Sequence, residues 1–195
     1  MNKILFGSTN KGKFKEAKHI CNAYNLNLVS PNELGLQVPD IIEDGKDYYE
    51  NALIKAKEFH RITTLPVISD DAGLEVLSLN NQPGIYSGRY AGEPCNMRSN
   101  IDKLLKNLTS KSDRSAKFKC CIVYYDGKNC LSQTSDLDGA ITLSEVGSGG
   151  FGYDGVFKVK GYEQTLSQIK ENNFNFETHR LKALKRVCQQ IIKLT

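Results

Sequence analysis

The sequence has no long run of apolar residues. A helix that crosses a membrane needs about 18 or more such residues, so the sequence predicts none. The N-terminus also lacks the apolar segment and small-residue cleavage site of a signal peptide. The sequence therefore indicates a cytoplasmic protein with no membrane partner.

Metal-ligand cysteine pairs are also missing, since none of the six cysteines stands in a C-x-x-C arrangement. Cys120 and Cys121 are neighbours in a strand-like run, so they should point to opposite faces. We expect reduced, mostly buried thiols rather than a zinc site.

The chain has only a small excess of positive charge, with a net charge of +4. Such an excess suits an anionic ligand, but there is no basic run of the kind that binds polymeric nucleic acid. The hydrophobic fraction of 39% is that of a globular chain with a sizeable core. With no repeat or linker in sight, we expect a single domain over residues 1–195.

Hydrophobic spacing predicts an α/β fold with a mixed sheet. A hairpin is expected in the second half, with its turn at Asp126-Gly127. A short strand over 66–69 is expected to end at Asp70-Asp71. The predicted helices cover 11–24, 48–60, 96–108 and 178–194, and the other predicted strands cover 2–8, 26–30, 116–126, 129–141 and 155–159.

The N-terminal stretch FGSTNKGKFKE looks like a phosphate-binding P-loop. A strand, a polar turn and a helix bring backbone N–H groups and a positive helix end to one point, which favours phosphate. Asn10 is a candidate helix cap and Lys13 a candidate phosphate contact. Phe14 stands where a P-loop has its magnesium-binding hydroxyl, and an ordinary capped helix with solvated lysines explains the same residues.

Two acidic stretches are candidates for a cation site. Asp70 and Asp71 follow an apolar strand, and carboxylate oxygens suit Mg²⁺. One of them would hold the ion and one would orient or deprotonate water. Glu43 is a candidate second metal ligand, and Lys55 a candidate residue at the edge of a cleft. A strand-end turn and a helix-dipole preference are the alternative explanations.

Two later segments also suggest a ligand. The stretch GSGGFGYD has four glycines, which permit close backbone approach or positive φ, and Phe151 and Tyr153 offer aromatic faces for a base. A flexible loop is the alternative. His179 and Arg180 begin the last helix, where the dipole favours acidic residues, and this mismatch indicates a ligand for the guanidinium.

The order of these motifs closely resembles the inosine triphosphate pyrophosphatase family. The match runs from Lys3 to the last helix, and the ordered set is far more specific than any single motif. The series is Ser8-Thr9-Asn10 with Lys13 and Glu16, then ENALIKA, SDDAGLEV, PGIYSGRYAG, GGFGYDGVF, GYEQT and THR.

The resemblance implies an elongated α/β fold, in which a long mixed sheet with flanking helices supports two lobes around a central cleft. It implies a homodimer that requires Mg²⁺ and hydrolyses non-standard purine nucleoside triphosphates, namely ITP, dITP and XTP. Water attacks the α-phosphorus, and the products are the monophosphate and pyrophosphate.

Site residues follow from the resemblance by position. Glu43 and Asp71 correspond to the metal carboxylates, and Asp71 also to the residue that activates water. Phe151 corresponds to the residue that stacks on the base, and His179 and Arg180 to the pair that reads the 6-oxo group. A donor aimed at position 6 suits a carbonyl and leaves an adenine amino group badly paired. The other implied substrate contacts are Ser8, Thr9, Asn10, Lys11, Gly12, Lys13, Lys55, Ala72, Gly152, Tyr153 and Asp154.

Two other functions are open at this point. One is a P-loop-like NTPase that cuts at the γ-phosphate, which Phe14 argues against because that fold wants a hydroxyl on the ion. The other is a non-catalytic nucleotide- or RNA-binding module, which the modest charge argues against.

The chain departs from the resembled family at Phe174, where the family has a lysine near the base. Lys170 is a lysine close by in the sequence. The substitution Phe174→Lys is expected to raise the ratio of ITP to ATP turnover, because it adds a donor at the base edge. Steady-state turnover of both nucleotides measures this ratio, and an unchanged or lower ratio would contradict the expectation.

Overall fold

The computed structural model describes residues 3–173 and 176–194 of the chain. Phe174, the departure from the resembled family, lies outside the described residues. The helices are α1 (Lys11–Ala23), α2 (Tyr48–Thr63), α3 (Met97–Asn107), α4 (Leu166–Asn172) and α5 (His179–Ile191), with the 3₁₀ turns η1 (Asn32–Leu34), η2 (Leu77–Leu79), η3 (Gly84–Arg89) and η4 (Gly152–Val156). The strands are β1 (Ile4–Phe6), β2 (Leu28–Val29), β3 (Val67–Val76), β4 (Gln82–Pro83), β5 (Ser115–Tyr125), β6 (Cys130–Ile141) and β7 (Phe157–Val159).

Among the described residues the strands form one seven-stranded mixed sheet. Its order is β2-β1-β3-β5-β6-β7, and β4 pairs with β3. β1 runs parallel to β2 and β3, whereas β3 with β4 and β6 with β7 are antiparallel. The α/β class and the mixed sheet predicted from the sequence are confirmed.

The chain divides into two compact units, and β3, β5 and β6 contribute residues to both. Unit 1 comprises Met1–Asp71, Cys120–Ser135 and His179–Thr195. Unit 2 comprises Ala72–Lys119 and Asp136–Thr178.

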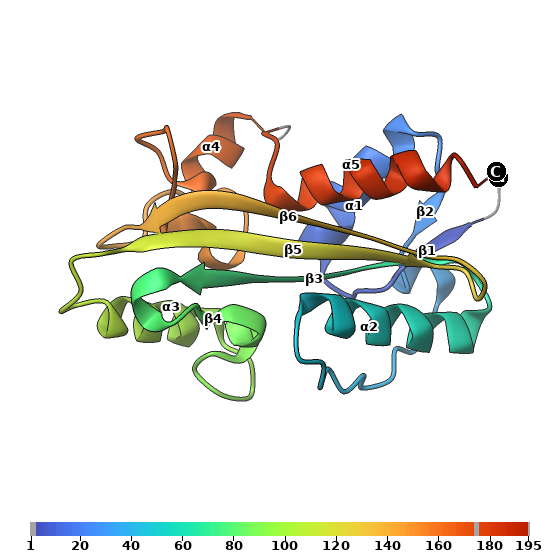
Figure 1. Ribbon diagram of the computed structural model, residues 1–195, viewed down its shortest axis with the longest axis horizontal. Helices are drawn as coiled ribbons and strands as arrows, with labels where there is room; N and C mark the ends of the chain where they lie inside the picture. The colour runs from blue at the N-terminus through green and yellow to red at the C-terminus, as the bar shows by residue number, and fades with distance from the viewer. Residues whose placement is uncertain (1–2, 174–175, 195) are drawn as a thin grey trace. The chain divides into compact units, whose positions relative to one another are not determined.

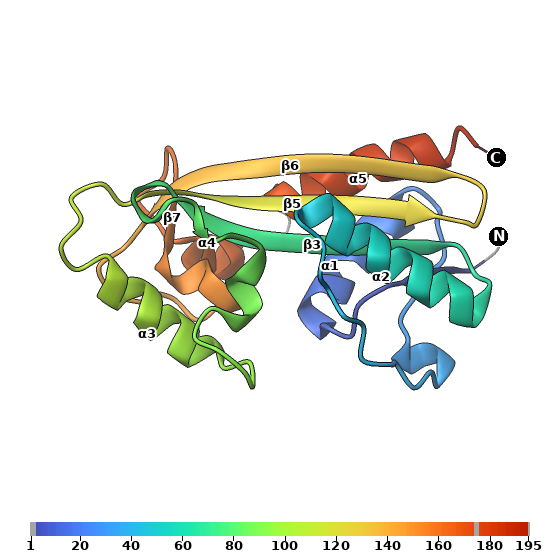
Figure 2. The same ribbon diagram turned by 60° about the horizontal axis from the view of Figure 1, so that its bottom comes forward.

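In unit 1, helices cover both faces of the sheet. α2 lies on one face, and α1 and α5 lie on the other (Figures 1 and 2). Because both faces are covered, β1 and β2 are apolar throughout and buried. This layering places the N-terminal ends of α1 and α5 on one side of β3 and the helix α2 on the other.

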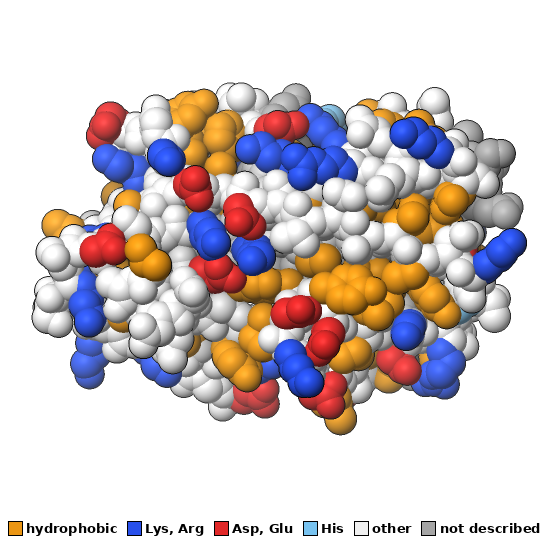
Figure 3. All heavy atoms as spheres, in the orientation of Figure 1, with side chains coloured by type: hydrophobic (Ala, Val, Ile, Leu, Met, Phe, Trp, Pro, Cys, Tyr) orange, Lys and Arg blue, Asp and Glu red, His pale blue; other side chains and the backbone are white. Residues whose placement is uncertain are grey.

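α1 and α5 pack against each other along apolar stripes. The Sγ atoms of Cys21 and Cys188 lie 3.8 Å apart, and neither side chain is exposed. The outward face of α5 is basic, and Figure 3 shows Lys and Arg side chains gathered over this helix. Burying each large apolar side chain of such a stripe contributes roughly 1.5–3 kcal/mol. The hydrophobic spacing that predicted this helix is confirmed, since its apolar side chains are buried, namely Leu181, Leu184, Val187, Cys188 and Ile191.

Unit 2 has its own apolar core between the sheet and the helices α3 and α4. Phe118 of β5 and Phe157 of β7 meet at a ring-centroid distance of 4.5 Å. α4 was not predicted from the sequence, because it is only about two turns long. It begins with a capping box, in which Thr165 accepts from the Gln168 N–H and the Gln168 side chain accepts from the Thr165 N–H.

One further expectation needs correction. The strand expected to end before Asp70 continues to Val76, so both aspartates lie inside β3.

The expectation of mostly buried, reduced thiols is confirmed within the described residues. Cys21, Cys120, Cys121 and Cys188 are free and buried, whereas Cys95 and Cys130 are free and exposed. In the part of the chain that the structure describes, no helix combines the length and apolar character that crossing a membrane requires.

Candidate active site

The turn between β1 and α1 is built as a capped helix start. The Asn10 side chain accepts from the Lys13 N–H at 3.0 Å, and the Ser8 hydroxyl accepts from the Asn10 N–H at 3.2 Å. Thr9 and Lys11 are exposed and Gly12 is half-buried, so the turn faces solvent. α1 has no acidic residue in its first turn that would neutralise its positive end. The predicted cap is confirmed, and the turn is suited to an anion.

Phe14 explains why this turn is not a Walker-type P-loop. Its ring lies 6.0 Å from the ring of Phe6, and the side chain is half-buried. The position therefore belongs to the packed face of α1 and has no hydroxyl to offer a metal ion.

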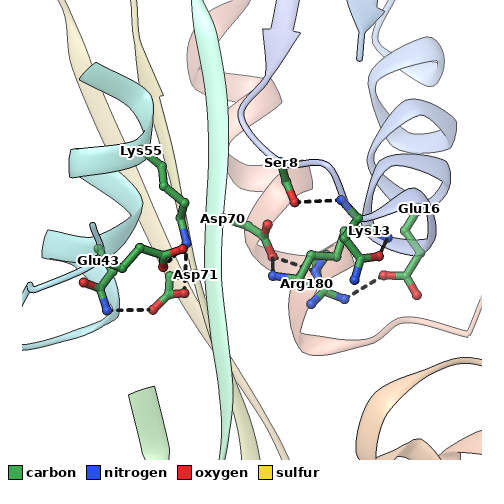
Figure 4. Close-up of polar contacts among 10 residues, drawn as sticks. Ser8, Lys13, Glu16, Glu43, Lys55, Asp70, Asp71 and Arg180 are labelled. Carbon is green, nitrogen blue, oxygen red and sulfur yellow. Dashed lines mark hydrogen bonds and ion pairs between the residues drawn. The ribbon is translucent and has the colours of Figure 1, made fainter. Parts of the chain in front are cut away.

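Asp70 and Asp71 point to opposite sides of β3 (Figure 4). Successive side chains of a strand alternate between the two faces of the sheet. Adjacent carboxylates in the sequence are thereby assigned to different charge networks. Asp70 faces α1 and α5, and Asp71 faces α2.

The Asp70 network joins three parts of unit 1. Its fully buried carboxylate accepts from Lys13 at 3.1 Å and from the Arg180 Nε at 3.1 Å. The Arg180 Nη1 also donates to Glu16 at 2.8 Å. Burial alone would raise the pKa of Asp70, but Lys13 and Arg180 outweigh it and hold the pKa well below its usual range. Asp70 is therefore a permanent anion and a poor proton acceptor.

The Asp71 network contains one cation between two carboxylates. The Lys55 ammonium donates to Glu43 at 2.5 Å and to Asp71 at 3.1 Å, and the Asn51 amide donates to Asp71 at 3.3 Å (Figure 4). Burial raises the pKa of Asp71 above its usual value, although Lys55 opposes this effect. Burial would lower the pKa of Lys55, yet Asp71 and Glu43 raise it. Lys55 therefore stays charged, and Asp71 is the better proton acceptor of the two aspartates.

The two carboxylates of this network, Glu43 and Asp71, are of the residue type that binds magnesium. Glu43 and Asp71 converge on one ammonium, so their oxygens already share a cation. Mg²⁺ is commonly held by one or two carboxylates and keeps several waters. Within the described residues, no cluster of three or more His, Cys, Asp or Glu side chains is suited to a metal. Any ion here would therefore depend on these two carboxylates together with water or phosphate oxygens.

The basic start of α5 has acidic partners within unit 1. The charge mismatch at Arg180 indicated a bound anion, but Glu16 and Asp70 supply the negative charge, and Arg180 is only 5% exposed. His179 is buried as well. Sequence reasoning had given Glu16 and Asp70 no part in holding Arg180, because they lie 164 and 110 residues from it.

In unit 2, the glycine-rich segment forms a supported loop. Gly152 has a φ of +67°, which favours glycine, and a Cβ at Gly150 would lie 2.2 Å from the Asp154 carboxylate. The Tyr153 hydroxyl donates to the Ser87 carbonyl at 2.9 Å. Tyr153 and Asp154 are buried, whereas Phe151 is half-buried.

A pocket of about 300 Å³ opens beside this loop in unit 2. Its lining includes Phe151, the loop glycines and Ile101 of α3. Ala72, the remaining implied substrate contact, directly follows Asp71 in β3 and is half-buried.

In a comparison with known families, residues 4–190 match the model of the Ham1 family. The chain belongs to the Ham1 family. A dITP/XTP pyrophosphatase of Desulfotalea psychrophila is 41% identical, over 97% of this chain and 86% of its own length. A dITP/XTP pyrophosphatase of Bacillus licheniformis is 38% identical, over 96% of both chains.

Solved structures of Ham1 proteins share the fold. The Staphylococcus aureus Ham1 protein superposes with a TM-score of 0.86 at 32% identity and covers 99% of this chain and 100% of its own. A HAM1 protein from Coxiella burnetii gives a TM-score of 0.88 at 32% identity with the same coverage. The resemblance seen in the ordered motifs is thus confirmed.

The Asp70 network leads to a prediction about stability. Asp70→Asn removes the shared buried anion of Lys13 and Arg180, so the free energy of unfolding is expected to fall by about 3 kcal/mol at pH 7. Because the folded-state pKa of Asp70 is depressed, its contribution is present above the unfolded pKa of about 3.9 and is lost as pH falls. The difference in free energy of unfolding between the unchanged protein and Asp70→Asn should therefore become smaller in acid.

Urea unfolding at pH 7 and at about pH 3 measures both effects. Asp138→Asn is the matched control, because this exposed residue pairs with Lys160 at 3.8 Å and should cost under about 1 kcal/mol. Equal losses for Asp70→Asn and Asp138→Asn at pH 7 would contradict the importance of the buried network.

Proposed function

We propose that this Ham1-family protein is an enzyme that hydrolyses non-standard purine nucleoside triphosphates to the monophosphate and pyrophosphate. The relatives named dITP/XTP pyrophosphatase support this activity and the substrate class of ITP, dITP and XTP. The observation that carries the mechanism is the pair Glu43 and Asp71 gathered on the Lys55 ammonium. By this reaction the enzyme removes non-standard nucleotides from the nucleotide pool.

The triphosphate is held by the turn from Ser8 to Lys13. Backbone N–H groups at the start of α1, and the positive end of that helix, attract phosphate oxygens. Lys13 and Lys55 add positive charge, and both are already held in place by carboxylates, which reduces the ordering cost of binding.

Asp71 accepts the proton of the attacking water. The water oxygen forms a bond to the α-phosphorus, the bond to the bridging oxygen breaks, and pyrophosphate leaves with the electron pair. The depressed pKa of Asp70, which Lys13 and Arg180 hold below its usual range, counts against Asp70 as the base. Glu43 and Asp71 would hold Mg²⁺, and the ion would supply charge neutralisation on the phosphates.

The base is stacked on Phe151 in the loop Phe151–Asp154, and His179 and Arg180 contribute to reading its 6-oxo group. The buried ion pairs of Arg180 support a role in fixing the N-terminal end of α5 as well. We propose one domain with two lobes, a homodimer and a cytoplasmic location as further properties. The packing of Phe14 counts against cleavage at the γ-phosphate.

The first test is the product released from a panel of nucleotides. With Mg²⁺, ITP, dITP and XTP are expected to give pyrophosphate, and ATP much less. Chelation of Mg²⁺ should stop the reaction. A coupled assay that separates pyrophosphate from orthophosphate measures the outcome; orthophosphate as the first product from ITP would refute the cleavage site, and intact ITP and XTP would refute the substrate class.

The second test addresses the base. Asp71→Asn removes the proton acceptor and a metal carboxylate, so kcat for ITP is expected to fall by about 10³-fold or more. Glu58→Gln on α2 is a control for removing a carboxylate, because it pairs with Arg61 at the surface. If Asp71→Asn retained most of the activity while remaining folded, the assignment of the base would be wrong.

A further inference from the structure

Lys170 of α4 is held against the loop that carries Phe151. Its ammonium lies 3.0 Å from the Asp154 carboxylate and 5.0 Å from the centroid of the Phe151 ring, over that ring. The side chains of Lys170 and Asp154 are 10% and 7% exposed. Lysine side chains are mostly exposed in proteins, and one this buried needs a partner such as Asp154.

The loop and α4 form one connected assembly within unit 2. The Ser167 hydroxyl donates to the Gly149 carbonyl at 2.6 Å, and Glu171 accepts from the Gly149 N–H at 3.1 Å. The Asp154 carboxylate accepts from the Phe151 N–H at 3.0 Å as well as from Lys170. The main chain of Phe151 and the ammonium of Lys170 are therefore positioned by the same carboxylate.

We propose that Lys170 is a specificity-determining residue, whose ammonium donates to a carbonyl oxygen on the edge of a purine stacked on Phe151. The proposal rests on the proposed function. Aromatic rings stack with an offset, so a purine that is displaced to one side on this face of the Phe151 ring presents an edge to the ammonium that lies over the ring. A lysine carries its charge on a flexible four-carbon stem, which lets the ammonium follow the base edge.

The sequence gives this cation a particular importance. Phe174 stands where the resembled family has its lysine, and Lys170 supplies a positive charge from a different position. A carbonyl at purine position 6 accepts from an ammonium, whereas the amino group of adenine at that position offers no acceptor in its place. Lys170 thereby favours 6-oxopurines over adenine.

A purely structural role for Lys170 makes a different prediction. If Lys170 only supports Asp154 and Phe151, its removal affects every base that stacks there. Purine riboside triphosphate, which has hydrogen at position 6, tests this difference because it stacks but offers no carbonyl. The ratio of kcat/KM for two substrates is also independent of the fraction of folded enzyme, since both are measured on one preparation.

The experiment compares Lys170→Met and Lys170→Arg with the unchanged protein. For Lys170→Met, kcat/KM is expected to fall about 10- to 100-fold more for ITP than for purine riboside triphosphate. Lys170→Arg keeps the charge and is expected to keep most of the preference for ITP. Lys160→Met removes a lysine that is 78% exposed and should leave the ratio unchanged. An equal loss on both substrates, or no loss, would overturn the proposal.

The double variant Lys170→Met, Phe174→Lys provides a second test of whether Lys170 donates to the base. The gain in the ITP to ATP ratio from Phe174→Lys should be larger in the Lys170→Met protein than in the unchanged protein, because the second lysine then replaces the missing donor. Equal gains in the two backgrounds would show that Lys170 does not supply this donor.

Calorimetric binding without Mg²⁺ separates this inference from the proposed reaction. ITP is expected to bind more tightly than purine riboside triphosphate, and Lys170→Met should remove that difference. If the unchanged protein binds ITP in this way but releases no pyrophosphate with Mg²⁺, the proposed reaction fails and the inference stands. If it hydrolyses ITP but binds both nucleotides equally well, the inference fails and the reaction stands.

Discussion

The alternation of side chains along β3 is the constraint on which the candidate active site depends. Because Asp70 and Asp71 face opposite sides of one strand, they gather two separate sets of charges. Asp70 ties the first helix to the last through Lys13 and Arg180, residues far apart in the chain. Asp71 meets the Lys55 ammonium of α2 on the other side. A strand that ended before the pair would leave both carboxylates in a solvated turn, without these fixed partners.

The same alternation separates the acid–base properties of two chemically identical groups. Asp70 has two cationic partners and a depressed pKa, while Asp71 shares one cation with Glu43 and has a raised pKa. Environments that push the pKa values of neighbouring groups apart are typical of sites in which each group has its own task. In the proposed mechanism Asp71 is the base, and Asp70, with its two cationic partners, is the poorer proton acceptor. The Asp70 network serves instead to fix the positions of Lys13 and Arg180.

Local signals in the sequence were sufficient for the elements that depend on local physics. The Asn10 cap and the stripe of α5 follow from residues within one or two helical turns, and both are confirmed. Long-range charge pairing was not predictable in this way. Asp70 looked like a strand terminus because carboxylates seldom lie inside a buried strand, and the cations that permit it lie elsewhere in the chain. The acidic partners of Arg180 were missed for the same reason, and its mismatch with the helix dipole was attributed to a ligand.

Two buried lysines illustrate the same limit and connect stability with recognition. Periodicity counts apolar positions, so it does not predict that Lys55 and Lys170 are largely buried and paired with carboxylates. A carboxylate as buried as Asp154 requires a counter-charge, since an unpaired one would cost several kcal/mol. Lys170 supplies this counter-charge, whatever the loop binds. Recognition of a base carbonyl by Lys170 needs no additional buried charge, because it uses the cation that the loop already requires.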